Sequence, residues 1–301
     1  MHAPESRNGG VYGTVLLASL LSVAHAAIFV RMADAEPLAI AAYRMVIAAA
    51  VVLPVALYLA RTEIRALASR EWGLIALGAA ALALHFATWI EGVARTSIAN
   101  AVVLVTLTPV WLALWAVVAL RRPPGARTWA AVVLAIAGSA VMAWGSFRIG
   151  FSSLLGDAYA LAGGLFFAGF FLVAEAVRRS VGTLAFVALV YAGAAVILWL
   201  AVLAAGLPVG GYAGETWVAL SALGLISQVI GHSGFNWAVR MIPPMVLALL
   251  LLSEPILSAA LGWLYFREGF GTETVIGGAL VLAAIYLGVR AEGAPDAPPK
   301  G

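Results

Sequence analysis

The sequence contains no cysteine, only one lysine among its 17 basic residues, and few charges of either sign. Without cysteine the chain can form no disulfide, no thiolate metal site and no thiol nucleophile. Only 10% of its residues are charged and 64% are hydrophobic, whereas about a quarter of the residues of a soluble domain carry charge. This composition excludes an ordinary water-soluble protein.

The apolar residues fall into successive blocks of about 20, which is the length at which a helix crosses roughly 30 Å of hydrocarbon. Lipid offers no partner for backbone N–H and C=O groups, so each block must satisfy them internally, as a helix does. The sequence therefore predicts an all-α integral membrane protein of ten transmembrane helices. The expected spans are 12–30, 37–60, 72–94, 97–120, 128–145, 155–177, 183–205, 216–239, 244–266 and 272–289.

Basic residues are distributed unevenly between the two sets of alternating loops. With a cytoplasmic N-terminus, twelve basic residues lie on the inside and four on the outside, and Arg44 falls within the second span. This bias predicts that both termini are cytoplasmic. The net charge of +3 is scattered between apolar blocks rather than gathered on one surface, so we expect no nucleic-acid partner.

An internal repeat divides the chain. A constant shift, the one that takes position 109 to position 255, aligns spans four and five with spans nine and ten without a gap. It pairs residues of scarce types: Pro109 with Pro255, Arg121 with Arg267, Gly125 with Gly271 and Thr128 with Thr274. Five spans is an odd number, so a second tandem copy must enter the membrane upside down. We predict two inverted five-helix repeats, 12–145 and 146–289, around a central cavity, flanked by cytoplasmic tails 1–11 and 290–301.

Two motifs stand out, Leu-Thr-Pro-Val at 107–110 and Ser-Glu-Pro-Ile at 253–256, each followed by an apolar run into a charged hairpin. The most specific stretch is 253–268, which begins with the second motif. With these motifs the chain resembles the drug/metabolite transporter superfamily, specifically its EamA-type ten-helix members. Arg122 departs from the acidic residue that the family often carries in the first-half hairpin. The length, aromatic content and His-bearing third span are further similar to bacterial aromatic amino acid exporters.

The resemblance implies a transporter that exports small metabolites by alternating access, with aromatic and other apolar amino acids as the best candidates and multidrug transport as the alternative. It implies no cofactor and no metal. We expect a small-molecule substrate, a lipid bilayer as the environment, and a monomer or homodimer. The predominance of arginine over lysine indicates a GC-rich bacterial genome, hence the bacterial cytoplasmic membrane.

Polar residues in mid-span are the candidates for substrate binding, because polar side chains facing lipid are costly. In span eight Gln228, His232 and Asn236 recur every four residues and share one helix face. They either line the transport path or join span eight to a neighbouring helix by hydrogen bonds. In span three His85 and Trp89 are also four apart and place an imidazole beside an indole, a pair suited to stacking.

Two charged residues lie inside predicted spans. Glu254 in span nine is a candidate proton-coupling group or partner for a substrate ammonium, or a neutral acid bonded to nearby carbonyls. Arg44 in span two either binds a substrate carboxylate or locks a pair of helices, and the sequence favours the lock. Pro109 and Pro255 each remove a helical hydrogen bond at matched depth, so we predict matched kinks that act as hinges.

An enzyme is the rival interpretation. Gly231-His232-Ser233-Gly234 is similar to the short Gly-x-Ser-Gly element of rhomboid intramembrane proteases. Those proteases take their general base from a later helix, and no histidine follows Ser233 in this chain. The sequence therefore predicts no catalytic residues.

Overall fold

The computed structural model describes residues 8–96, 98–121, 124–144, 151–239, 241–267 and 272–292. All regular structure within these ranges is helical, which confirms the predicted fold class. The first repeat contains α1 (Asn8–Ala24), α2 (Ala26–Met32), α3 (Pro37–Leu59), α4 (Arg61–Arg65), α5 (Ser69–Arg95), α6 (Ile98–Val105), α7 (Thr108–Val118) and α8 (Ala126–Trp144). The second contains α9 (Phe151–Val177), α10 (Thr183–Ala204), α11 (Gly214–Ala222), η1 (Leu223–His232), α12 (Ser233–Ala238), α13 (Pro244–Leu251), α14 (Glu254–Phe266) and α15 (Thr272–Glu292).

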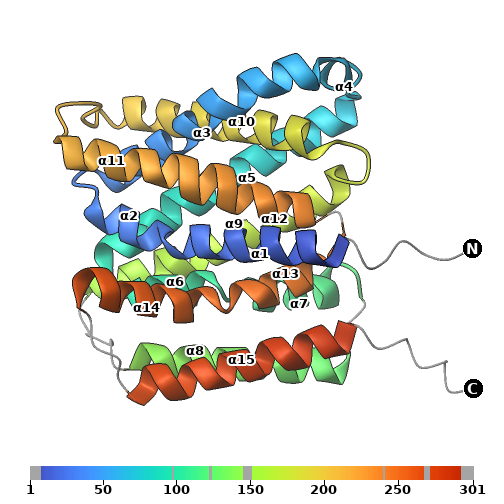
Figure 1. Cartoon of the computed structure of the whole chain (residues 1–301), viewed down its shortest axis with the longest axis vertical. Helices are drawn as coiled ribbons and strands as arrows, with labels where there is room; N and C mark the ends of the chain where they lie inside the picture. Colours follow the sequence, from blue (N-terminus) through green and yellow to red (C-terminus); the bar gives the residue numbers. More distant parts are fainter. Residues whose placement is uncertain are drawn as a thin grey trace, which may run out of the picture.

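These elements make up the ten predicted membrane crossings. Eight helical stretches within the described ranges have the length and hydropathy of membrane spans, and two shorter apolar stretches, Ala126–Val141 and Val275–Gly288, belong to α8 and α15. The helices run roughly parallel across the molecule, and α1 begins on the side where α15 ends (Figure 1). Large apolar side chains such as Leu200 and Val133, each 62% exposed, cover the outer surface, as contact with lipid requires.

The two repeats match in detail at the register that the sequence defines. The shift that pairs Pro109 with Pro255 brings both ends of α6 onto the ends of α13, and the starts of α7 and α8 onto those of α14 and α15. Arg121 and Arg267, an equivalent pair at this register, both adopt a left-handed backbone, with φ of 51° and 59°. Non-glycine residues rarely have positive φ, so this pair is independent evidence for the duplication.

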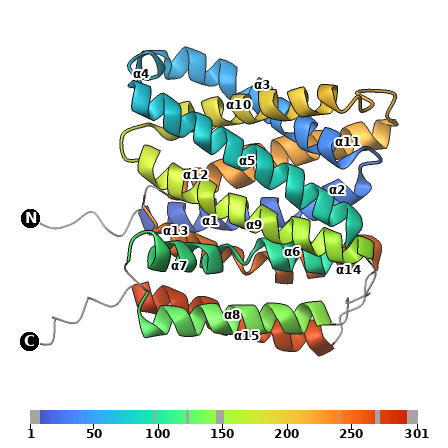
Figure 2. The same ribbon diagram turned by 180° about the vertical axis from the view of Figure 1, so that it is seen from behind.

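The repeats pack mainly against each other. Helix α5 lies along α9, α3 along α10, α1 along η1, and α8 along α15, and both views show the α8–α15 pair at one end of the molecule (Figures 1 and 2). Each pair joins one helix of the first repeat to one of the second. The main buried core contains residues of both repeats, so neither half has a separate core.

Several spans differ from the continuous helices that the sequence predicts. Span one is interrupted between α1 and α2, and span eight contains the ten-residue π-helix η1. Spans four and nine do not kink at their prolines as predicted. The helix ends before each proline and restarts, at Thr106–Leu107 and at Leu252–Ser253, because proline cannot donate the next helical hydrogen bond but fits the first turn of a new helix.

The predicted tails fall partly on helix. Helix α1 begins at Asn8 and α15 extends to Glu292, so parts of the segments 1–11 and 290–301 are helical. Residues 1–7 and 293–301 lie outside the described residues, as does Arg122 of the charged hairpin.

Candidate functional site

The helix interruptions meet in the middle of the molecule. At the α1–α2 interruption, the carbonyl of Ser22 accepts a hydrogen bond from Ser227 Oγ (2.9 Å) and the carbonyl of Ala24 accepts one from Ser258 Oγ (3.1 Å). These hydroxyls come from η1 and α14, so side chains of the second repeat satisfy backbone groups that the break frees. Broken helices around a midplane site are a recurring feature of inverted-repeat transporters.

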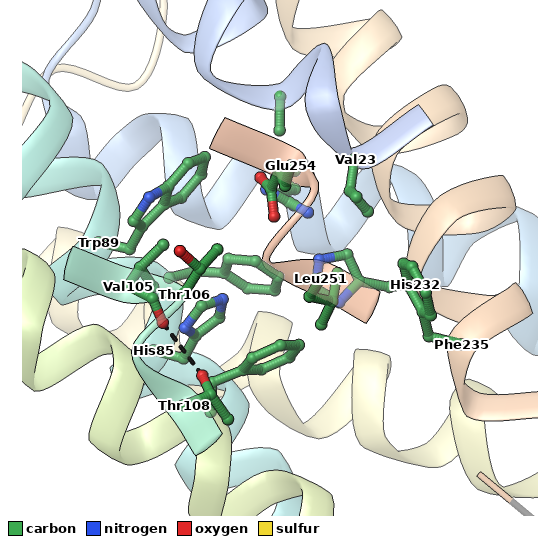
Figure 3. A pocket seen from close by; sticks show the side chains of 14 residues that line it. Val23, His85, Trp89, Val105, Thr106, Thr108, His232, Phe235, Leu251 and Glu254 are labelled. Atoms are coloured by element: carbon green, nitrogen blue, oxygen red, sulfur yellow. Dashed lines mark hydrogen bonds between the residues drawn. The ribbon is translucent and has the colours of Figure 1, made fainter. Parts of the chain in front are cut away.

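A central cavity lies between these interruptions and is lined by both repeats (Figure 3). Its lining is rich in aromatic rings and holds one cationic and one acidic side chain. The lining residues are Val23, Ala26, Arg44, His85, Phe86, Trp89, Val105, Thr106, Thr108, Phe167, His232, Phe235, Leu251 and Glu254.

His85 and Trp89 both line this cavity from α5. His85 Nδ1–H donates to the carbonyl of Gly163 on α9 at 3.0 Å, and because a carbonyl only accepts, a neutral ring keeps its acceptor on Nε2. The rings of His85 and Trp89 are nearly parallel, at 9° with centroids 6.4 Å apart, and Phe167 stacks on His85 at 4.5 Å. Gly163 allows α9 to pack closely against Trp89 of α5, since a Cβ at Gly163 would lie only 3.1 Å from Trp89 Cβ.

The predicted row on span eight is turned inward but does not act as one unit. Gln228, His232 and Asn236 are all buried. Only His232 lines the cavity, where its ring contacts those of Phe86 and His85 at centroid distances of 5.3 and 6.3 Å. The amide of Asn236 donates to the carbonyl of His232 at 2.9 Å, and Gln228 bonds to Arg44. These two residues therefore stand behind the cavity wall.

Arg44 is completely buried in α3. Its Nε–H donates to Gln228 Oε1 at 2.7 Å, and its guanidinium lies over the ring of Phe86 at 3.8 Å. The bond to Gln228 joins α3 to η1 and so links the two repeats. This contact fits the predicted helix lock, yet the same side chain also lines the cavity.

Glu254 is the acidic member of the lining and is the first residue of α14, directly after the break in span nine. Figure 3 shows its carboxyl group pointing into the space between Trp89 and His232. Thr108 has the same place at the start of α7, and its hydroxyl donates to the carbonyl of Val105 at 3.0 Å. The two breaks thus present a hydroxyl from one repeat and a carboxyl from the other.

Pro109 and Pro255 follow Thr108 and Glu254 in the first turn of α7 and α14. Both prolines are buried, and neither belongs to the cavity lining. Their effect on the site is indirect, because they fix where each helix restarts and hence where Thr108 and Glu254 point.

Sequence reasoning missed several lining residues, among them Phe86, Phe167, Thr108 and Phe235. The repeat itself contained a signal for two of them. At the register that pairs Pro109 with Pro255, Thr108 corresponds to Glu254 and Phe235 corresponds to Trp89. Carrying each candidate residue across the repeat would have found both.

The cavity has a volume of about 30 Å³. This is room for one or two water molecules, whereas small-molecule sites are commonly about 300–1,000 Å³. In this structure the cavity is therefore too small to hold such a ligand.

Ser233, the residue of the protease-like element, lies outside the cavity lining and pairs with the hydroxyl of Tyr191 at 3.1 Å. Across the described ranges, no group of three or more His, Asp or Glu side chains is placed to hold a metal ion.

Ten crossings in two repeats around a small cavity lined by aromatic rings and two charged side chains are the architecture of a multi-pass membrane protein. The sequence model of the EamA-like transporter family matches residues 12–144 and again residues 154–290. The chain belongs to the EamA-like transporter family, within the drug/metabolite transporter superfamily. It is accordingly a membrane transporter of small metabolites, and the family consists of transporters rather than enzymes.

Comparison with solved structures supports the fold. A structure titled "Crystal structure of protein" superposes with a TM-score of 0.76 at 18% sequence identity, covering 94% of this chain and 98% of that one. At this identity the likeness concerns the fold alone. Comparison with curated proteins gave no match.

Proposed function

We propose that this protein exports small amphipathic metabolites, foremost aromatic and other apolar amino acids, across a bacterial cytoplasmic membrane. The observation that carries the proposal is the composition of the central cavity, where the rings of His85, Phe86, Trp89, Phe167, Phe235 and His232 accompany the charged groups of Arg44 and Glu254. Rings stack on an aromatic side chain, and Glu254 is suited to a substrate ammonium. His85, Trp89 and His232 contact the substrate directly, whereas Gln228 and Asn236 support the wall.

Alternating access is the mechanism that we propose. The cavity has only about 30 Å³ of space, and the main helix pairs join one repeat to the other. Rocking of one repeat against the other would open the centre first to one side and then to the other. The restarts at Pro109 and Pro255 serve as the hinges, because backbone hydrogen bonding is already interrupted there.

The proposed topology has both termini in the cytoplasm, with repeats 12–145 and 146–289 between the two tails. Its support is the excess of basic residues on that side. The protein acts as a monomer or homodimer, with proton coupling through Glu254 as the mode of energisation.

Export of organic cations, as in multidrug transport, is the second candidate, which the aromatic lining favours. The buried cation of Arg44 opposes it, because like charges repel strongly where water is excluded.

Flux measurements in proteoliposomes test the proposal. Labelled phenylalanine and tryptophan should move faster than in protein-free vesicles, and faster than a lipophilic cation such as ethidium. His85→Ala and Trp89→Ala should each lower amino acid flux about tenfold or more, with the folded fraction unchanged. Val133→Ala, on the lipid-facing surface of α8, is the control. Unchanged flux in both cavity variants would reject the pocket, and movement of ethidium alone would favour the second candidate.

A further inference from the structure

We propose that Arg44 is the receptor for a carboxylate group of the transported substrate. This inference rests on the proposed function and narrows it to substrates that carry a carboxylate. It assigns to Arg44 a role beyond that of a lock between helices.

The first support is the state of the Arg44 guanidinium. The side chain has no solvent exposure, and its Nε–H is bonded to Gln228. Neither Nη1 nor Nη2 has a hydrogen-bond partner in the part of the chain that the structure describes. A buried cation with unpaired donors is costly, so a protein normally pairs such a group or keeps it for a ligand.

The second support is the position of these donors. Arg44 lines the central cavity, where the ring of Phe86 at 3.8 Å and that of Trp89 at 5.9 Å flank its guanidinium. The rings and the bond from Nε fix the plane of the fork. The indole Nε1–H of Trp89 also has no partner among the described residues. The two Nη groups of Arg44 therefore remain as donors for the two oxygens of one planar anion.

Glu254 does not satisfy Arg44, although both line the same cavity. Within the described ranges the ion pairs are Arg95–Glu91 and Arg179–Glu175, and none involves Arg44. One cation and one carboxylate that share a cavity without bonding to each other match a zwitterion placed between them. A dianion such as a phosphate monoester fits less well, because the lining offers it only one cation, Arg44, and the charge of Glu254 would repel it.

A hydrogen bond that only holds α3 against η1 would not require the two Nη groups of Arg44. The link between α3 and η1 uses only Nε and Gln228 Oε1, and a neutral donor could make it. Arginine adds a planar pair of Nη groups with the spacing of a carboxylate. The rival account is a structural arginine whose Nη groups are hydrated by the one or two waters that the cavity can hold.

Binding by the purified full-length protein separates these accounts. The probes are phenylalanine and phenylalaninamide, which share the ring and the amine and differ only in the carboxylate. Affinity is read from titrated thermal stabilisation in detergent. The wild type should bind phenylalanine at least tenfold more tightly than the amide, because the amide leaves the buried fork without an anionic partner.

Arg44→Gln should remove this preference. The affinity for phenylalanine should fall at least tenfold, while the affinity for phenylalaninamide should change by no more than about twofold. Arg44→Lys, which keeps the charge but lacks the fork, should retain only part of the preference. Gln228→Leu removes the lock and one of the contacts that orient the fork but keeps the guanidinium, so it should retain a preference clearly larger than that of Arg44→Gln. The proposal is overturned if Arg44→Gln still prefers the carboxylate, or if Gln228→Leu loses the preference to the same extent.

A second probe pair separates failure of this inference from failure of the proposed function. If the wild type binds neither phenylalanine nor its amide, the amino acid proposal fails, and the test is repeated with 3-phenylpropionate and 3-phenylpropanamide. A preference for the phenylpropionate that depends on Arg44 would support the carboxylate receptor for another substrate. If the wild type binds 3-phenylpropionate and 3-phenylpropanamide equally well, or binds neither, the role of Arg44 as a carboxylate receptor is rejected.

Discussion

Thr108 and Glu254 occupy equivalent positions in the two repeats, and each is the first residue of the helix that restarts after a break. Both side chains reach the central cavity. The hydroxyl of Thr108 is bonded to the carbonyl of Val105 within its own repeat, whereas Glu254 carries an ionisable group. At this pair of equivalent positions the site is thus chemically asymmetric, with a carboxyl group in the second repeat and a hydroxyl in the first.

Glu254→Gln should abolish coupling of transport to a pH gradient. Glutamine keeps the shape of the side chain but cannot take up or release a proton. In an exchange of protons for substrate, the protons move in the direction opposite to the substrate. In proteoliposomes, an acidic solution on the side that receives the substrate should therefore accelerate wild-type flux. This acceleration should be absent in the variant. The measurement is labelled phenylalanine flux with and without an imposed pH gradient.

Glu175→Gln is the matched control, because Glu175 pairs with Arg179 near the end of α9, outside the cavity. It should respond to the gradient as the wild type does. If neither the gradient nor Glu254→Gln changes the flux, the protein is a facilitator, and Glu254 neither couples transport to protons nor binds the substrate.

Gly164→Ala should impair both stability and transport. A Cβ at Gly164 would lie 2.8 Å from the carbonyl oxygen of Val105, the same oxygen that accepts the bond from Thr108. Overpacking of this kind costs about 1–3 kcal/mol, and it would push α9 away from the break in span four. We expect a lower unfolding temperature in detergent and a lower flux.

Gly169→Ala, on the same helix, is the control for Gly164→Ala. No atom outside the adjoining backbone of α9 lies within 4 Å of a Cβ built at Gly169. This variant should therefore be neutral or stabilised by up to about 1 kcal/mol, the helix preference of alanine over glycine. Equal effects of the two substitutions would mean that close approach at the break is not what Gly164 provides.

The absence of cysteine makes the inverted topology directly measurable. Arg121→Cys and Arg267→Cys place single thiols at equivalent exposed positions of the two repeats. Because the second repeat is inverted, a membrane-impermeant maleimide should label position 121 only from the cytoplasmic side and position 267 only from outside. Labelling of both from one side would contradict the inversion.

The sequence was sufficient to predict the architecture, because length, hydropathy and repeat register are local or periodic properties. The repeat register that pairs Pro109 with Pro255 also pairs the breaks before them, although the sequence suggested kinks rather than restarts. Polar residues deep in a span, such as His85 and Glu254, could be selected because their burial in lipid would be costly.

The remaining features depend on packing between distant segments. No sequence period predicts that η1 is a π-helix, or that Gln228 turns toward Arg44 while His232 turns toward the cavity. The serine bonds that satisfy the break in span one connect residues from opposite ends of the chain. The unpaired Nη groups of Arg44 become visible only when all the neighbours of the side chain are known.

The most direct test of the account uses a single thiol in the cavity wall. Val105→Cys is nearly isosteric, and Val105, which lines the cavity, is 6% exposed. Val133→Cys on the lipid-facing side of α8 is the control. In the cysteine-free background a small impermeant thiol reagent should modify position 105 when added from either side of the membrane, and bound phenylalanine should slow this reaction at least several-fold. Modification from one side only, or a rate that substrate leaves unchanged, would contradict a central site with alternating access.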